Sequence, residues 1–338
     1  MPRFTLVFCW SYLLLVSALL ASTFLLGDRW WFATFVLFGP RWVSAVPLIL
    51  LFPSAVVWNW RALLPLGLVF IVVCGPLMGL CLKGEQPRGG GMETLRVLSC
   101  NINAGMFDAS ALVAAVLGNG VDVVALQECP RELWLELPPG WQMLREGNLA
   151  LLSRHRISPG QSLQALHPPH RWPRTTLLSC VIHTPLGVVN FCTVHLPSPR
   201  YGLLTVLDRK TVLSPARLPM LRAETSYRRR CSEDVRRVVA SLPQPVIVAG
   251  DFNMPVESTI YRRDWGELHN AFSSSGSGYG WTERVSVRGI PIKVRIDHIL
   301  TDGGFTARSC ATGRDVGSDH LPLMADITRV PEGRKAMP

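Results

Sequence analysis

The amino-acid sequence predicts an α/β protein with mixed β-sheets that follows about three membrane-spanning helices. Two observations lead to this prediction. The first 82 residues hold only five charged side chains, four basic and one acidic, whereas the rest of the chain is polar. In that polar remainder, short apolar runs typical of buried strands alternate with helical stretches, and no repeat period is present.

Three uncharged stretches make up most of the first 82 residues, at residues 4–26, 42–60 and 62–82. Each is close to or above the roughly 20 residues that cross the hydrocarbon core of a bilayer. A cleaved signal peptide is disfavoured for the first stretch, because its apolar run is too long and two further spans follow. Residues 29–41 are too short to span, so we expect them at the membrane interface between the first two helices.

Basic residues near these helices bear on their orientation. The positive-inside rule counts Lys and Arg close to the membrane and gives little weight to acidic residues. It favours a cytoplasmic C-terminal part, since two basic residues fall on one side and four on the other: Arg3 and Arg61 against Arg29, Arg41, Lys83 and Arg88. The difference is small, and the side of the membrane is left open.

The domain boundaries follow from composition. Residues 1–82 form the expected transmembrane anchor, and the Gly- and Pro-rich residues 83–92 form a flexible linker. Residues 93–330 are long enough to bury a core of their own, and residues 331–338 are expected to be a disordered tail.

Charge and cysteine content limit the partners of the polar part. The chain carries 34 Lys and Arg against 24 Asp and Glu, of which the first 82 residues hold four and one, leaving a net charge of about +7. Such a charge favours anionic partners, although a solvated basic surface is the alternative. The nine cysteines show no CxxC pair or Cys/His ligand spacing, which disfavours zinc and leaves open whether any of them pair.

The sequence of the polar part first predicts a strand at 95–101. A helix follows, which begins after its N-cap residue Asp108 and ends near Asn119. A long basic helix is predicted at 217–242. Further strands are predicted at residues 121–126, 149–153, 176–183, 188–195, 245–249, 294–300 and 321–327. Strands dominate and helices intervene, which indicates an α/β sandwich.

Polar residues gather where these strands end, the usual place for functional groups on a rigid scaffold. Each has a structural explanation by itself. Asn101 could be a turn residue, Asp251 could cap a helix at 254–261, Glu128 could be solvated, and His195 could be a satisfied buried side chain. Together, separated carboxylates, asparagines and histidines at strand ends favour a catalytic site.

The chemistry that unites this set is phosphoester hydrolysis. That reaction needs an activated water, neutralisation of negative charge on the phosphoryl oxygens, and a stabilised leaving oxygen. Mg²⁺ held by one or two carboxylates supplies much of this, and a carboxylate, an amide and a histidine paired with a second carboxylate complete the requirements.

The motifs that carry these residues resemble a known superfamily. In chain order they are NINAG, DVVALQE, LALLSR, TVHLP, VAGDFN, IDHIL and GSDHLPL. This order is similar to that of the endonuclease/exonuclease/phosphatase superfamily, which includes DNase I-like nucleases, abasic-site endonucleases, neutral sphingomyelinases and inositol-polyphosphate phosphatases. GDFN followed about 65 residues later by SDH is the most specific part. The resemblance runs from about residue 93 to 328 and implies a four-layer α/β sandwich.

The resemblance implies a role for each matching residue. Glu128 would be the main Mg²⁺ ligand, with Asn101 beside it and Asp319 in the metal environment; Mn²⁺ is the alternative ion. Asp251 would activate the attacking water, and Asn253 would bind a phosphoryl oxygen.

The remaining matches concern the phosphate. His320 would stabilise its developing charge and be held by Asp297, and His195 would lie near the scissile phosphate. Asn103 stands where some nucleases carry Asp, and Arg154 could contact substrate or serve the fold. Asn253, Asn103 and Arg154 are thus the expected substrate-binding residues.

The predicted function is that of a membrane-anchored, Mg²⁺-dependent phosphodiesterase. Membrane-anchored members of the superfamily are common in bacteria, so a multi-pass protein of a bacterial inner membrane is expected. The motifs do not separate phospholipid head groups from nucleic acids or inositol phosphates as substrates, and no obligate protein partner is evident. The alternatives are a nuclease, for which the basic run at residues 228–230 could contact a polyanion, and a non-catalytic interaction module with the same fold.

Overall fold

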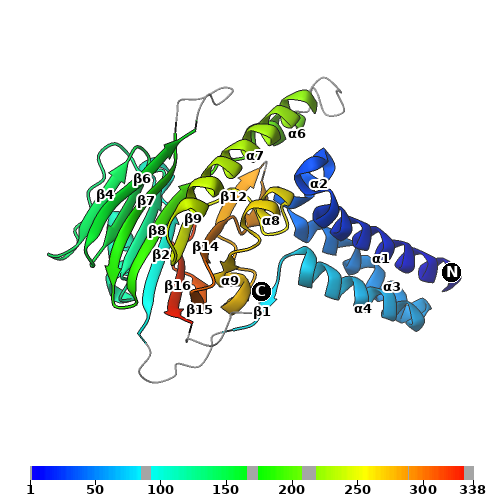
Figure 1. The fold of residues 1–338 in the computed structure, drawn as a ribbon. Coiled ribbons are helices and arrows are strands. Elements are labelled where there is room, and N and C mark those ends of the chain that lie inside the picture. The colour runs from blue at the N-terminus through cyan, green and yellow to red at the C-terminus, as the bar shows by residue number, and fades with distance from the viewer. Residues whose placement is uncertain (1, 85–92, 166–173, 208–217, 288, 331–338) are drawn as a thin grey trace.

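The computed structural model describes residues 2–84, 93–165, 174–207, 218–287 and 289–330 (Figure 1). Most of the predicted linker, at residues 85–92, and the whole predicted tail, at residues 331–338, lie outside the described residues. The described part comprises an N-terminal helical bundle, which projects to one side, and two β-sheets with their covering helices (Figure 1).

The N-terminal bundle comprises residues 2–77. It contains α1 (Pro2–Leu25), the short α2 (Trp31–Phe38), α3 (Val46–Trp58) and α4 (Leu63–Val72). Three helical segments are long and apolar enough to cross a membrane, as predicted: Arg3–Leu25, Arg41–Trp58 and Trp60–Leu77. Small and aliphatic side chains such as Cys9, Ala55 and Val69 pack between the helices, while large apolar side chains point outward. A helix that is apolar all round suits a lipid environment.

The last helical segment ends earlier than residue 82, where the sequence prediction placed its end. The helix passes into a π-turn at Val73–Leu77, in which Gly75 has non-helical dihedral angles and Pro76 lacks an amide hydrogen. The chain then forms β1 (Cys81–Leu82), which pairs antiparallel with β11 (Ser277–Gly278). The final residues of the predicted span therefore belong to the sheet-containing part.

Two six-stranded sheets form the framework of the rest of the described structure. The first has the order β15 (Phe305–Thr312), β16 (Leu323–Arg329), β2 (Leu95–Asn101), β3 (Val123–Gln127), β5 (Leu149–Ser153) and β4 (Gln142–Glu146). The second has the order β10 (His269–Asn270), β14 (Asp297–Thr301), β9 (Val246–Asp251), β8 (Gly187–His195), β7 (Thr175–Thr184) and β6 (Ile157–Gln164). In each, one central pair is parallel, β2–β3 and β8–β9, and the other paired neighbours are antiparallel.

The sheets pack face to face and make a four-layer sandwich. Alternate residues of the central strands point into the shared core, as Val97, Ala125, Phe191 and Ile247 do. Their neighbours point outward, toward α5 (Ala109–Gly118) on the first sheet and toward α7 (Leu218–Ser241) and α8 (Thr259–Trp265) on the second. The predicted layered α/β architecture is confirmed.

Buried polar contacts join the bundle to the sandwich. Asp28, just after α1, accepts a 3.0 Å hydrogen bond from Nη1 of Arg228 on α7, and both side chains are at most 2% exposed. Ser258 donates to the same carboxylate at 2.5 Å. A second ion pair joins Arg41 to Glu257 at 3.3 Å. Burial acts to raise the pKa of Asp28, but Arg228 and the hydrogen bonds outweigh it and hold that pKa below its usual value.

Candidate active site

Strand register brings the predicted site residues together at one end of the sandwich. On the second sheet, Asp251 of β9 lies opposite His195 of β8 on one side and Asp297 of β14 on the other. On the first sheet, Asn101 of β2 lies opposite Gln127 of β3. All five occur at inward-facing positions that continue the period-two pattern of the core, so the apolar core becomes polar at its end.

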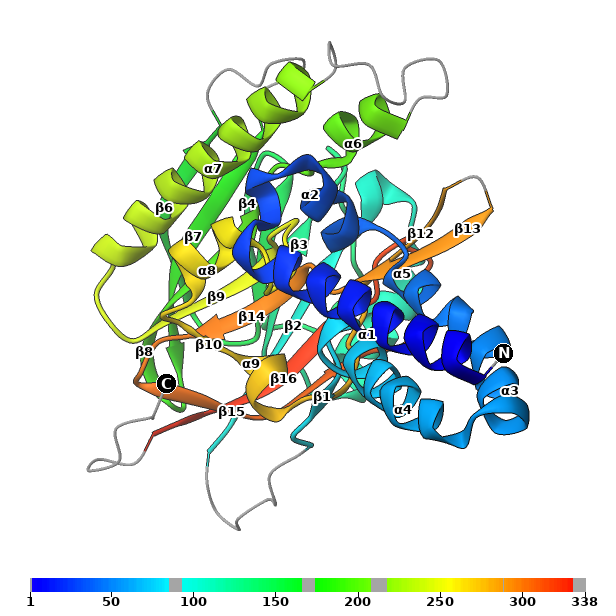
Figure 2. The same ribbon diagram turned by 90° about the vertical axis from the view of Figure 1, so that its right-hand side faces the viewer.

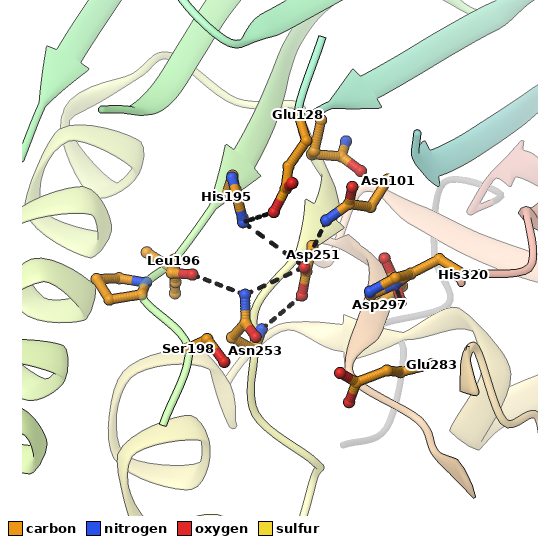
Figure 3. Close-up of polar contacts among 12 residues, drawn as sticks. Asn101, Glu128, His195, Leu196, Ser198, Asp251, Asn253, Glu283, Asp297 and His320 are labelled. Atoms are coloured by element: carbon orange, nitrogen blue, oxygen red, sulfur yellow. Dashed lines mark hydrogen bonds and ion pairs between the residues drawn. The ribbon is translucent and has the colours of Figure 1, made fainter. Parts of the chain in front are cut away.

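Hydrogen bonds then link the two sheets at this polar end. Asn101 donates from Nδ2 to Oδ2 of Asp251 at 3.0 Å, and Gln127 donates from Nε2 to Oγ1 of Thr193 at 2.9 Å. Figure 3 shows Asn101, Glu128, His195, Asp251 and His320 directed toward one another. A cavity of about 500 Å³ opens here, and its lining includes eight of the predicted residues: Asn101, Asn103, Glu128, His195, Asp251, Asn253, Asp319 and His320.

The chain bends sharply after each of these strands. Asn103, Glu128 and Asn253 have left-handed backbone conformations, with φ of 46°, 53° and 50°. Asparagine tolerates this region, but glutamate does so at a cost, and such strain is characteristic of functional sites. Gly250 is required before Asp251, because a side chain there would collide with the backbone of Val194 on the neighbouring strand.

Asp251 is held by the loop that follows it. The Asn253 amide N–H donates to Oδ1 of Asp251 at 2.8 Å, and its side-chain Nδ2 donates to Oδ2 at 3.1 Å. The same Nδ2 also donates to the carbonyl of Leu196 at 2.8 Å. Both side-chain donor hydrogens of Asn253 are therefore engaged, so in this arrangement the residue orients Asp251. To donate to a phosphoryl oxygen, Asn253 would have to break the longer of its two side-chain hydrogen bonds, the one to Oδ2 of Asp251.

His320 and Asp297 form a pair on the opposite wall. Nδ1 of His320 lies 2.8 Å from Oδ2 of Asp297, and Asp297 is fully buried beneath the ring. The Ser318 hydroxyl donates to the Asn101 carbonyl at 2.7 Å and accepts from the His320 amide at 3.2 Å, which fixes the loop. Burial disfavours the charged ring, but the Asp297 carboxylate outweighs it and raises the pKa of His320 to about 10.

His195 has the opposite electrostatic character. Asn148 accepts the Thr175 amide at Oδ1, so its Nδ2 faces Nδ1 of His195 at 3.2 Å as the donor. The imidazole proton is thereby assigned to Nε2, which lies 3.5 Å from Oε1 of Glu128 and 3.7 Å from Oδ2 of Asp251. Burial lowers the pKa of His195 to about 4, so the ring is neutral at pH 7.

The carboxyls of Glu128 and Asp251, which both line the cavity, differ in the direction in which their pKa values are shifted. Burial acts to raise the pKa of Glu128, but His195 and Arg174 outweigh it and hold that pKa below its ordinary value. Burial and then the Asp297 carboxylate raise the pKa of Asp251 well above the ordinary value. One carboxyl is suited to remain charged and the other to accept a proton, a pairing typical of catalytic sites.

Two groups of side chains could hold a divalent cation. The predicted set, Glu128 with Asn101 and Asp319, offers only oxygen donors to the cavity, and Glu128 is 25% exposed there. A second set, Asp251, Asp297 and His320, has ligand atoms within 4.8 Å of one another. In this second set, Nδ1 of His320 is already engaged in the hydrogen bond with Asp297. The raised pKa keeps the ring protonated, and a protonated imidazole cannot bind a metal ion. The oxygen donors of the first set fit Mg²⁺ better.

One expected substrate contact is misplaced. Arg154 follows β5 at the end away from the cavity, where β5 residue Ser153 pairs with Val123 at the start of β3. Its guanidinium forms an ion pair with Asp122, and it does not line the cavity. Because β5 runs antiparallel to β3, its last residues lie far from the end that carries Glu128. Of the two roles considered for Arg154, this position favours a structural one over a contact with substrate.

Two other residues of the site were not predicted. Asn148 orients His195, and Arg174 places Nη1 3.7 Å from Oε1 of Glu128. Asn148 immediately precedes the LALLSR motif, and polar character before a strand was its only signal in the sequence. Arg174 lies outside all the motifs.

Residues 98–320, which include most of the sandwich, match the sequence pattern of the endonuclease/exonuclease/phosphatase family. The chain belongs to this family. No curated protein matches the sequence.

Several solved structures are similar to this chain at low sequence identity. TDP2 from D. rerio in complex with a single-strand DNA product is 16% identical, with a TM-score of 0.50 over 70% of this chain and 99% of that one. The human Nocturnin catalytic domain with bound sulfate is 15% identical, with a TM-score of 0.49 over 70% and 95%. An endonuclease/exonuclease/phosphatase from Beutenbergia cavernae is 17% identical, with a TM-score of 0.45 over 70% and 72%. At these identities the likeness concerns the fold alone.

Proposed function

We propose that this protein is a membrane-anchored, Mg²⁺-dependent phosphodiesterase that catalyses attack of water on phosphorus. One observation carries the proposal. The His320–Asp297 pair and the Glu128 carboxylate face one cavity from opposite walls, with Asp251 between them (Figure 3). A non-catalytic interaction module would have no need of carboxyls and histidines whose pKa values are shifted in opposite directions around one cavity.

Glu128, Asn101 and Asp319 would hold the cation. All three residues line the cavity, and Glu128 does so from a left-handed backbone conformation. Bound Mg²⁺ neutralises phosphoryl charge and makes water more acidic. Arg174, beside Glu128, adds a positive charge that favours an anionic substrate.

Asp251 is the proposed base. Its raised pKa gives it affinity for a proton, and Asn101 and Asn253 fix its orientation. It would take a proton from the attacking water. Asn103 lines the cavity near these groups and remains a proposed substrate contact.

The two histidines act on the phosphate from different sides. His320, protonated through Asp297, would neutralise charge on the phosphoryl group and donate a proton to the leaving oxygen. His195 is neutral and would donate its Nε2 hydrogen to a phosphoryl oxygen. The pair of differently protonated rings gives one charged and one neutral donor.

The N-terminal bundle is the proposed anchor. Its three long apolar helices match the thickness of a bilayer, and exposed Trp30, Trp31 and Trp42 lie at the ends nearest the sandwich. We propose a multi-pass protein of a bacterial inner membrane, with the sandwich at the membrane surface. Residues 93–330 are the proposed catalytic domain.

The proposal is tested with the full chain in detergent micelles. Hydrolysis of bis(4-nitrophenyl) phosphate is measured with Mg²⁺ and with excess EDTA, for the wild type and for Glu128→Gln. The exposed Glu132→Gln is the matched control. We expect EDTA to abolish turnover and Glu128→Gln to lower it about 100-fold or more, because a main metal ligand is lost. Full activity in EDTA would contradict the metal assignment.

A further inference from the structure

The active-site cavity continues into an apolar groove. The two share Ser198, Arg200, Asn253 and Glu283, so the groove begins at the residue that orients Asp251. Beyond these shared residues its walls are apolar, formed by Phe35, Phe38, Leu203, Leu204, Val285 and Ile292. The groove proper has a volume of about 90 Å³.

One wall of this groove comes from the N-terminal bundle. Phe35 and Phe38 belong to α2, and Leu203 belongs to α6 (Arg200–Leu207). Phe38 packs in one apolar cluster with Leu203 and Ile292, which brings α2 beside α6 and the hairpin β12–β13 (Glu283–Val287 and Ile290–Val294; Figure 2). A segment between two proposed membrane spans therefore forms part of the surface that leads to the catalytic residues.

The groove lies at the level of the proposed membrane surface. Trp30 precedes α2, Trp31 is its first residue and Trp42 follows it, each about 40% exposed. Nε1 of Trp42 donates to the Pro291 carbonyl at 3.0 Å, so the β12–β13 hairpin reaches the same level. Tryptophan favours the boundary between acyl chains and head groups. The exposed Leu204 and Ile290 lie on elements at this boundary.

The charge of the groove disfavours a polyanion. Its lining residues include one cation and one anion, and Arg200 pairs with Glu283 at 3.1 Å. A nucleic acid strand carries one negative charge per nucleotide and is bound largely through Lys and Arg contacts to its phosphates. An apolar, neutral extension fits a substrate with a single phosphodiester and a hydrocarbon part.

From these observations we infer that the substrate is a membrane lipid with a phosphodiester head group. The phosphodiester would lie in the cavity, and the hydrocarbon next to it would lie in the groove between α2, α6 and the hairpin. This inference rests on the proposed function. Water oxygen forms a bond to phosphorus, one P–O ester bond breaks, and the leaving oxygen takes a proton, giving a phosphomonoester and an alcohol.

The test compares substrates that differ only in their acyl chains. The full chain is reconstituted in vesicles, and hydrolysis of dioleoyl phosphatidylglycerol is compared with that of its deacylated form, glycerophosphoglycerol. Single-stranded DNA and bis(4-nitrophenyl) phosphate are assayed in parallel. We expect the lipid to be hydrolysed with at least a tenfold higher kcat/KM than glycerophosphoglycerol, because apolar burial in the groove adds to binding.

A matched pair of variants tests the groove. Leu204 on α6 is 46% exposed, and Leu117 on α5 at the other side of the sandwich is 45% exposed. We expect Leu204→Asp to lower the ratio of lipid to bis(4-nitrophenyl) phosphate turnover at least tenfold, and Leu117→Asp to leave it unchanged. An unchanged ratio in Leu204→Asp would overturn the inference.

The remaining outcomes separate the two proposals. Equal rates for the lipid and glycerophosphoglycerol, or faster cleavage of DNA, would overturn the lipid assignment and leave the phosphodiesterase intact. No hydrolysis of any phosphodiester, the chromogenic one included, would instead contradict the proposed function.

Discussion

At the scale of single residues, the site depends on groups whose protonation is set by burial and by one neighbour each. His320 and His195 are both buried, but only His320 has a carboxylate within hydrogen-bonding distance. His195 is kept neutral by burial, and it accepts a hydrogen bond from the Asn148 amide, which places its proton on Nε2, toward the cavity. The two rings thus have different roles because of Asp297 and Asn148, neither of which needs to touch the substrate.

This difference makes a prediction about His320 in the metal-free protein. Its folded pKa of about 10 lies above the ordinary 6.5, so the pairing stabilises the fold fully below pH 6.5 and less as pH rises through 10. Asp297→Asn should lower the pKa of His320 by about 1–3 units. The measurement is an NMR titration of labelled histidine in EDTA, with the exposed His183 as the reference signal. A wild-type His320 that titrates near 6.5 would refute the pairing.

At the scale of elements, the contact between Asp28, in the turn after α1, and Arg228 of α7 links the bundle to the site. Arg228 donates to Asp28, and it also donates to the carbonyls of Asn253 at 3.0 Å and Pro197 at 3.2 Å. Both carbonyls belong to loops that line the cavity. The bundle therefore supports the loop that holds Asp251, and the sandwich is not independent of the helices before it.

Removing this support should be costly. Asp28→Asn leaves Arg228 buried without its counter-charge, and we expect a loss of about 3–5 kcal/mol in the free energy of unfolding. Asp234→Asn, which removes an exposed pair with Arg237 on the same helix, is the control and should cost under about 1 kcal/mol. Thermal unfolding in detergent measures both.

The pH dependence of this pair has a defined sign. The pKa of Asp28 lies below the ordinary 3.8, so its contribution is present above pH 3.8 and is lost as pH falls through the lower folded value. The stability difference between the wild type and Asp28→Asn should therefore shrink in acid below pH 3.8. A difference that is equal at pH 7 and in strong acid would show that the pair is not the cause.

The elements also show what the sequence could predict. Strands β2 and β5 were predicted with their observed bounds, because fully buried strands are continuous apolar runs. The edge strands β4 and β6 and the β12–β13 hairpin were missed, since their exposed residues break that pattern. The predicted strand at 294–300 is divided, because Val294 ends β13 and β14 begins only at Asp297.

The site was predicted by motif and not by geometry. The positions of Glu128, Asp251 and His320 were visible as polar residues at strand ends, but strand register, which places Asp251 beside Asp297, is not encoded locally. For the same reason the sequence did not show that Arg154 lies beside Asp122, at the end of β5 away from the cavity. Asp28 had a signal that was not used: it is the single acidic residue among the first 82.

At the scale of the whole molecule, the arrangement places the proposed hydrolytic site beside the proposed membrane anchor. The three long apolar helices lie on one side of the sandwich, and α2 and the β12–β13 hairpin occupy the boundary between them and the cavity (Figure 2). Tethering confines the site to the layer in which lipid head groups are concentrated. The proposed function and the lipid inference therefore depend on the same junction.

The central claim is that water attacks phosphorus in this cavity. It is tested most directly by hydrolysis of bis(4-nitrophenyl) phosphate in H₂¹⁸O by the full chain with Mg²⁺, followed by ³¹P NMR of the product. We expect a phosphomonoester whose phosphorus signal shows the isotope shift of one ¹⁸O, and no such product with His320→Asn or in EDTA. A product with unlabelled phosphate, or labelled product formed equally by His320→Asn, would contradict it.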